Sequence, residues 1–241
     1  MPHFESCISN GKHSVGCTGR TVYLFDPDDN VLAKFRDLTY AYVSAFSPDD
    51  DIFAVKSTVG RLAIYSADER RLIKKFRFTK MDHSQNDMFC FSPDGELFYN
   101  IERHGDYLNS LLAVYRADDF TLQKQLFSDE PLDPKIIEFD TSAAEIYIMG
   151  YERDRDGFIR KYFVAKLVGD ELRFKEPITE REYDFYWAYK HVEAIGYLGE
   201  AKNWSGCVYA GFDFSKTEPG KHSLSKLWHY YRQKRAVDIS T

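Results

Sequence analysis

Short apolar runs separated by polar turns recur along the chain, and this pattern predicts strands. The stretch "YVSAFSPDDDIFAVKSTVGRLAIYSADERRLIKKF", Tyr42–Phe76, contains four such runs, rich in Val, Ile, Phe and Tyr. Runs of this length with turn residues between them are typical of β-strands. Ser47 and Pro48 suit the first two positions of a type I turn. We therefore expect this stretch to form one small four-stranded antiparallel sheet.

The same unit returns several times. "MFCFSPDGELFYNI" repeats the turn 45 residues later, with Ser92 in the place of Ser47. "LAVYRADDFTLQKQLF" and "VYLFDPDDNVLAKF" both match "LAIYSADERRLIKKF". Further along, "IIEFDTSAAEIYIMGY" occupies the place of the first two strands and "KYFVAKLVGDELRFKEPI" that of the last two. Four strands at a period of about 45 residues predict the blades of a β-propeller.

Burial gives a physical reason for the repetition. A single four-stranded sheet has two faces and cannot cover both, whereas copies packed around an axis bury apolar side chains on both sides. Runs such as "DIFAVKS" and "IIEF" are more apolar than strict alternation would give, as this packing requires. A β-sandwich also uses short strands and is the alternative architecture. The turn-by-turn match between units favours the all-β propeller.

The motifs "FSPDG" and "LAIYSAD" resemble the WD-repeat β-propeller family, in which such a turn joins the first two strands of a blade. The resemblance is clearest over residues 40–128. No Gly-His dipeptide precedes a first strand, and the Trp-Asp pair of the family is replaced by Phe25-Asp26, Tyr65-Ser66 and Tyr115-Arg116. The resemblance implies a divergent member that holds other proteins or peptides and has no chemistry of its own.

The repeat pattern divides the chain into five expected blades within a single domain spanning residues 1–241. Their approximate ranges are 1–38, 39–80, 81–130, 131–180 and 181–241. In the last range, Leu224, Leu227, Trp228 and Tyr231 have the spacing of one helix face, which favours a short C-terminal helix. The other interpretation makes this segment the outermost strand of the fifth blade.

Composition and charge narrow the classes of function. The 241 residues are 44% hydrophobic, which is enough for a packed core, and the formal net charge of −6 argues against general nucleic-acid binding. No apolar run is long enough to cross a membrane, and the N-terminus lacks a basic region followed by an apolar stretch. We therefore expect a cytoplasmic protein without a membrane partner, whose four isolated cysteines are reduced.

Two acidic stretches have part of the pattern of a calcium loop. "DPDDN", Asp26–Asn30, is followed by Val31 in place of the glycine and by Asp37 in place of the final glutamate that such loops need. "ERDRDGF", Glu152–Phe158, carries Arg153 and Arg155, whose charges oppose a cation, and Arg160 stands where a last carboxylate is expected. We interpret both as hairpin turns and expect no metal and no cofactor.

The leading functional hypothesis is a non-catalytic protein- or peptide-binding scaffold. Propeller loops lie at two rigid, wide ends, and such loops tolerate variation, so they suit binding. One end should combine the loops between blades with the loops between second and third strands. The expected binding residues there, together with one from the aromatic stretch "YDFYWAY", are Tyr40, His83, His104, Tyr107, Arg153, Arg155 and Trp187.

Two other hypotheses follow from the same fold. A propeller enzyme, such as a glycoside hydrolase, needs an acid and a base or nucleophile about 5–10 Å apart in the central channel. The first strands of the expected blades offer few acids, Asp87 and Glu138, so we do not expect an enzyme. The remaining hypothesis is self-association, because an incomplete fifth blade would leave an open strand edge.

Overall fold

The computed structural model describes residues 6–59, 61–77, 88–104, 109–140, 144–180, 182–183, 208–209 and 212–213. These residues form strands and turns, and among them only Glu180, Glu182 and Tyr183 are helical. No helix in this part of the chain is long and apolar enough to cross a membrane. The predicted all-β class is confirmed. The predicted C-terminal helix lies outside the described residues.

Within the described residues there are four sheets of four antiparallel strands, each with its strands in sequence order. The first contains β1 (Ser6–Ser9), β2 (Ser14–Cys17), β3 (Val22–Phe25) and β4 (Val31–Phe35). The second contains β5 (Ala41–Phe46), β6 (Ile52–Ser57), β7 (Arg61–Ser66) and β8 (Arg71–Arg77). The third contains β9 (Phe89–Phe91), β10 (Leu97–His104), β11 (Asn109–Arg116) and β12 (Leu122–Leu126). The fourth contains β13 (Leu132–Asp140), β14 (Glu145–Arg153), β15 (Ile159–Val168) and β16 (Glu171–Ile178).

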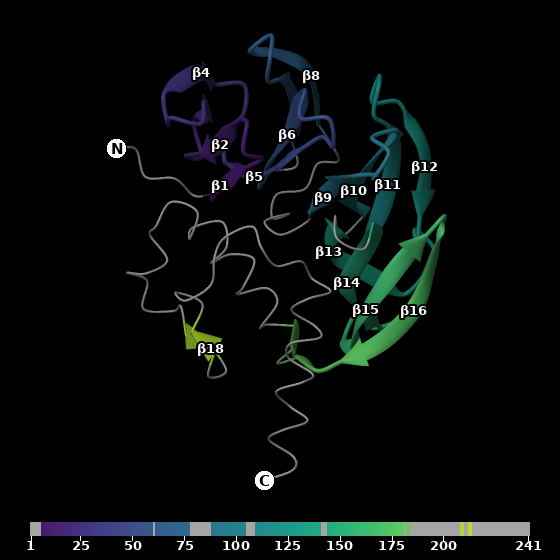
Figure 1. Ribbon diagram of the computed structural model, residues 1–241. Coiled ribbons are helices and arrows are strands. Elements are labelled where there is room, and N and C mark those ends of the chain that lie inside the picture. Colours follow the sequence, from purple (N-terminus) through teal and green to yellow (C-terminus); the bar gives the residue numbers. More distant parts are fainter. Residues whose placement is uncertain are drawn as a thin grey trace.

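The sheets follow one another in an arc (Figure 1). The first strands are the inner ones, and β1 contacts β5, β5 contacts β9, and β9 contacts β13. The arrangement is propeller-like, but the four described sheets do not close into a ring. In the range 181–241 the described strands are a short pair, β17 (Val208–Tyr209) and β18 (Phe212–Asp213). The division into five blades within a single domain stays a prediction.

Among the described residues, three apolar clusters fill the core, one between each pair of neighbouring sheets. Successive side chains of β6 in the second sheet show how both faces of a sheet are used. Phe53 and Val55 pack toward the first sheet, and Ala54 packs toward the third. In the same way, Tyr65 faces the first sheet and Ile64 the third. Successive side chains of a strand point to opposite faces. The expectation that each sheet buries both faces is therefore confirmed for the second and third sheets.

Consecutive strands of each sheet are antiparallel, so the loops after the first and third strands all lie at the same end of the strands. We call this the acidic end, and in the first three sheets it is made of residues 10–13, 26–30, 47–51, 67–70, 92–96 and 117–121. Contacts tie these loops together: Asn10 Nδ2 donates to Asp50 Oδ1 at 2.7 Å, and the backbone N–H of Ala67 donates to the carbonyl of Asp51 at 2.9 Å. These loops thus form one continuous surface over the first two sheets.

The predicted turns are present at this end and are held by their own side chains. The Ser47 hydroxyl accepts the N–H of Ile52, and the Ser92 hydroxyl accepts the N–H of Leu97 at 2.8 Å. Each serine therefore closes the turn between the first and second strand of its sheet. The repeated "SPD" motif is thus a local folding signal.

The loops after the second and fourth strands lie at the opposite end, which we call the hairpin end. It contains residues 18–21, 36–40, 58–59, 127–131 and 154–158. The N–H of Thr58 donates to the carbonyl of Tyr40 at 3.0 Å, and the N–H of Arg153 donates to the carbonyl of Pro131 at 3.0 Å. Loops between sheets therefore lie beside loops within sheets, as the sequence predicted for one end.

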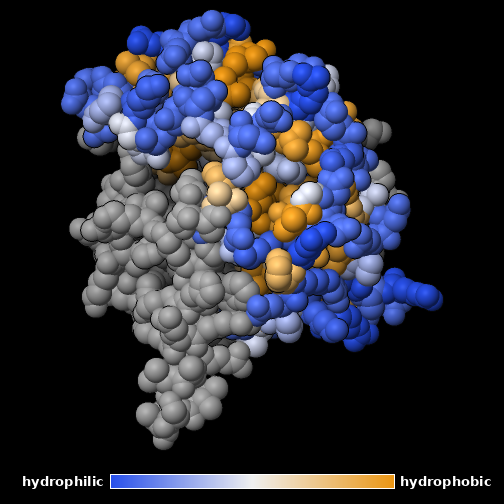
Figure 2. All heavy atoms as spheres, turned by 45° about the vertical axis from the view of Figure 1, so that its right-hand side comes forward, coloured by the Kyte–Doolittle hydropathy of each residue, from blue (hydrophilic) through white to orange (hydrophobic). Residues whose placement is uncertain are grey.

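Figure 2 brings forward the side that carries the third and fourth sheets, where hydrophilic residues surround gathered hydrophobic atoms. Exposed apolar side chains occur on the fourth, outermost strand of every sheet, namely Val31, Ile73, Leu122 and Phe174. Single exposed apolar residues of this kind are normal on a protein surface. They do not by themselves mark a site.

Candidate functional site

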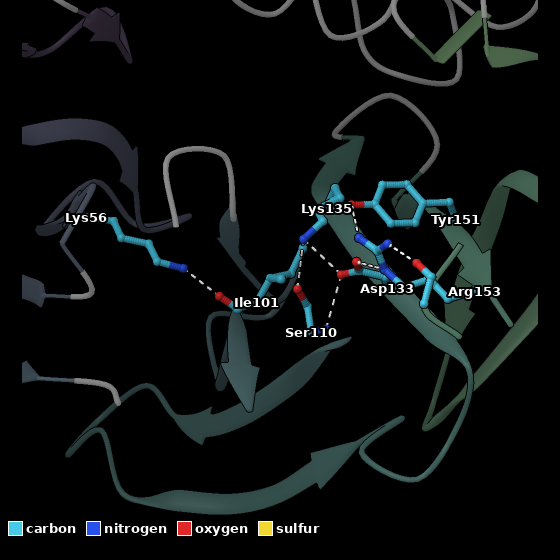
Figure 3. Close-up of polar contacts among 8 residues, drawn as sticks. Lys56, Ile101, Ser110, Asp133, Lys135, Tyr151 and Arg153 are labelled. Atoms are coloured by element: carbon cyan, nitrogen blue, oxygen red, sulfur yellow. Dashed lines mark hydrogen bonds and ion pairs between the residues drawn. The ribbon is translucent and has the colours of Figure 1, made fainter. Parts of the chain in front are cut away.

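A buried polar network lies directly beneath the hairpin end, between the third and fourth sheets (Figure 3). Its centre is Asp133 on β13, whose side chain is 1% exposed. One carboxylate oxygen accepts the backbone N–H of Ser110 at 3.1 Å and lies 2.8 Å from Lys135 Nζ. The other oxygen accepts Arg153 Nε at 3.0 Å, and Lys135 Nζ also donates to the Ser110 hydroxyl at 3.0 Å. The network therefore joins three strands from two sheets.

Local backbone geometry brings these groups together. The register of β13 against β14 shifts between Pro134 and Ile136, so one extra residue is accommodated there. Gly150 pairs with Pro134 at this point, and a Cβ atom on it would lie only 2.4 Å from the carbonyl oxygen of Asp133. Glycine thus permits the close approach of β13 and β14 that places Asp133 beside Arg153.

The electrostatics of the network favour an ionised carboxylate. Burial by itself raises the pKa of Asp133, but the charge of Lys135 and the hydrogen bonds from Lys135, Ser110 and Arg153 outweigh it, so the pKa is lowered. The Arg153 guanidinium lies over the Tyr151 ring, 4.7 Å from its centroid, and donates to the Tyr151 hydroxyl at 3.0 Å. Burial and the charge of Asp133 raise the pKa of Tyr151 to about 12, so this hydroxyl stays protonated.

A second buried polar group joins the second and third sheets. Lys56 on β6, 4% exposed, donates to Asn100 Oδ1 at 2.9 Å and to the carbonyl of Ile101 at 2.5 Å. Glu102 in turn accepts Asn100 Nδ2 at 2.9 Å and the Tyr115 hydroxyl at 2.6 Å. Burial raises the pKa of Glu102 even though these donors and Lys56 lower it. Both networks connect neighbouring sheets, so their chemistry is that of an internal brace.

The β14–β15 hairpin projects from this braced region. The Asp154 carboxylate accepts the N–H groups of Asp156 and Phe158 at 3.0 and 2.8 Å, and it pairs with Arg160. Arg153 Nη1 donates to the carbonyl of Gly157 at 2.6 Å, which attaches the tip to the buried network. Phe158 at the tip is 67% exposed. The interpretation of "ERDRDGF" as a hairpin turn is therefore confirmed.

The other acidic stretch is also a hairpin, between β3 and β4. The Asp26 carboxylate accepts the N–H groups of Asp28 and Asn30 at 3.0 and 2.8 Å, which closes the turn. Within the described part of the chain, no group of His, Cys, Asp and Glu side chains has an arrangement that could hold a metal ion.

The predicted binding residues fall into different places. Tyr40 is 64% exposed at the hairpin end, and Arg155 is exposed at the β14–β15 tip. Arg153 was expected in a loop but is the last residue of β14. Its side chain, 18% exposed, is paired with Asp133 inside the fold. His104 ends β10. The structure does not describe His83, Tyr107 or Trp187.

Of the acids considered for an enzyme, Glu138 is half-buried on β13, and Asp87 lies outside the described residues. Sequence reasoning missed Lys56, Asp133 and Lys135. The signal was present, because "DIFAVKS" and "LDPKIIEF" each place charged residues within apolar strands, where a charge must find a partner. It also missed Phe158, which directly follows the glycine of its turn.

Comparisons with known proteins support the fold and leave the function open. No family model and no curated protein sequence matches the chain. Among solved structures, hydrazine synthase from Kuenenia stuttgartiensis is similar with a TM-score of 0.55 and 13% sequence identity. The match covers 71% of this chain and 47% of that chain, so this chain spans about half of that protein. A likeness at this identity shows a propeller-like all-β fold.

Proposed function

We propose that the chain is a divergent WD-repeat-like propeller that acts as a non-catalytic scaffold, binding a protein or peptide at its hairpin end. The observation that supports this is the bracing of the β14–β15 tip. Arg153 connects the tip carbonyl of Gly157 to the buried carboxylate of Asp133. The tip is thereby preorganised, which lowers the entropy lost on binding.

The exposed groups at this end suit a protein partner. Phe158 and Tyr40 offer large apolar surfaces, and Arg155 offers an exposed cation. Aromatic residues and arginine are enriched at protein interfaces, where they contribute most of the binding energy. The buried Lys, Asp, Glu and Arg side chains of the two networks are paired within the fold, and this favours a binding role over catalysis.

The finer architecture is part of the same proposal. Met149 and Val164 are fully buried on the face of the fourth sheet that points away from the third sheet. Their burial supports a fifth blade, which we expect from residues 181–241, a range that lies almost wholly outside the described residues. A solved structure with four or six sheets around the axis would contradict it.

The test compares two variants with matched exposure at opposite ends. Arg155→Glu/Phe158→Ser alters the hairpin tip, and Asp68→Lys/Asp119→Ser alters the acidic end. Partners captured by the immobilised folded protein are identified by quantitative mass spectrometry. We expect the tip variant to lose at least tenfold of a specific partner that the acidic-end variant retains. Equal capture by both variants, with circular dichroism showing both folded, would exclude the hairpin end as the binding surface.

A further inference from the structure

The two ends of the arc differ in charge. Exposed carboxylates occur in the loops of the first three sheets at the acidic end, namely Asp28, Asp29, Asp49, Asp51, Asp68, Glu69, Asp94, Glu96, Asp118 and Asp119. The exposed cations in these loops are Lys12 and Arg70, while Arg71 and Arg116 are paired with Glu69 and Asp118. A surface with this balance creates a negative potential that attracts cationic groups.

The β14–β15 tip at the opposite end has the complementary character. Arg155 and Lys161 are exposed, and the apolar residues Phe158 and Ile159 lie between them. The carboxylate of Asp154 is compensated by Arg160 and that of Glu152 by Lys175, which leaves Asp156 as the opposing charge. The tip is therefore cationic and apolar in a chain whose net charge is −6.

We infer that the β14–β15 tip of one copy docks on the acidic end of a second copy. The second copy is favoured as the occupant because both halves of the contact are present on this chain. The acidic end also offers apolar surface, since Pro27, Pro48 and Pro93 are exposed beside its carboxylates. Phe158 contacts this proline surface while Arg155 and Lys161 face the carboxylates.

The geometry determines the kind of assembly. The tip follows a second strand and the acidic-end loops follow first and third strands, so the two surfaces lie at opposite ends of the strands and the contact joins unlike surfaces, head to tail. A heterologous contact leaves one unused surface of each kind on every dimer, so it extends into a ring or a filament. Association should therefore increase with concentration beyond the dimer.

The experiment measures mass by light scattering and sedimentation for the full chain of 28.1 kDa. Protein concentrations run from about 10 to 200 µM, at about 0.05 M and about 0.5 M salt. At the higher salt concentration, screening weakens contacts between exposed charges. The tip variant is Arg155→Glu/Lys161→Glu, and the acidic-end variant is Asp51→Lys/Asp68→Lys/Glu96→Lys. The control for the tip variant is Lys75→Glu/Gln123→Glu on the outer strands β8 and β12, which changes the net charge by −3 where the tip variant changes it by −4.

We expect the wild type and the control to reach at least twice the monomer mass at low salt and to dissociate at high salt. Each end variant alone should stay monomeric. An equimolar mixture of the two end variants should associate again, because each reversed surface then meets an opposite charge on the other variant. This restoration would not occur if the substitutions had merely damaged the fold.

A wild type that stays monomeric over the whole range would overturn the inference, as would a mixture that fails to associate. The inference goes beyond the proposed function and can fail separately from it. A monomeric wild type that still captures its partner through the tip would leave the scaffold proposal in place. Conversely, salt-sensitive self-association without partner capture would leave the inference in place.

Discussion

Replacing Asp133 by asparagine removes the one carboxylate at the centre of the network between the third and fourth sheets. Lys135 Nζ at 2.8 Å and Arg153 Nε at 3.0 Å then lose the negative charge of Asp133. The side chain of Lys135 is 7% exposed, so its ammonium group has little access to water in compensation. Asparagine has nearly the same shape, and the change is therefore one of charge.

The magnitude follows from the burial of these groups. Removing one partner of a buried ion pair costs about 3–5 kcal/mol, because the remaining charge is left uncompensated. Arg153 keeps part of its surface in water, so we expect a loss of about 3 kcal/mol in the free energy of unfolding. With an m-value of about 2–3 kcal/mol/M, the urea midpoint should fall by about 1–1.5 M.

The assay is urea unfolding followed by circular dichroism, with Asp170→Asn as the matched control. Asp170 forms an exposed ion pair with Lys124, and such pairs contribute at most about 1 kcal/mol. Because the pKa of Asp133 is lowered on folding, its contribution is present above the unfolded pKa of about 3.9 and is lost as pH falls through the folded value. A midpoint for Asp133→Asn no lower than that of the control would refute the reasoning.

Three further predictions concern stability and use the same urea titration. Gly150→Ala should cost about 2 kcal/mol or more, since the new methyl group would meet the carbonyl of Asp133 at 2.4 Å, and an unchanged midpoint would show that β13 and β14 can separate freely. Glu102→Gln should gain stability relative to the wild type as pH rises. The pKa of Glu102 is raised on folding, so its contribution to the free energy of unfolding is full below the unfolded pKa of about 4.3 and is lost above the folded pKa. A difference between the two proteins that does not change with pH would contradict this. Arg70→Gly should raise the free energy of unfolding by up to about 1 kcal/mol, because Arg70 has a φ of 53°, where glycine is not strained. A lower urea midpoint would show that the Arg70 side chain stabilises the fold by more than this backbone strain destabilises it.

Most of the fold could be predicted from local patterns. The turns at Ser47 and Ser92 are closed by hydrogen bonds within five residues, so the motif alone predicts them. Strand alternation likewise predicts that Phe53 and Ala54 face opposite sides. The candidate site was harder to predict. Arg153 was expected in an exposed loop, yet its partner Asp133 is 20 residues away in sequence and meets it only through the register of β13 and β14.

The sequence by itself determined the strands, their turns and their period, because these depend on side chains a few residues apart and on the need to bury both faces of each sheet. Only the tertiary structure decided which charges are internal and which face water. Lys56 of the second sheet donates to Asn100 of the third, and Asp133 forms ion pairs with Lys135 and Arg153. Arg155, only two residues after Arg153, stays exposed. Ion pairing depends on distances between strands and sheets, and residue order along the chain does not contain those distances.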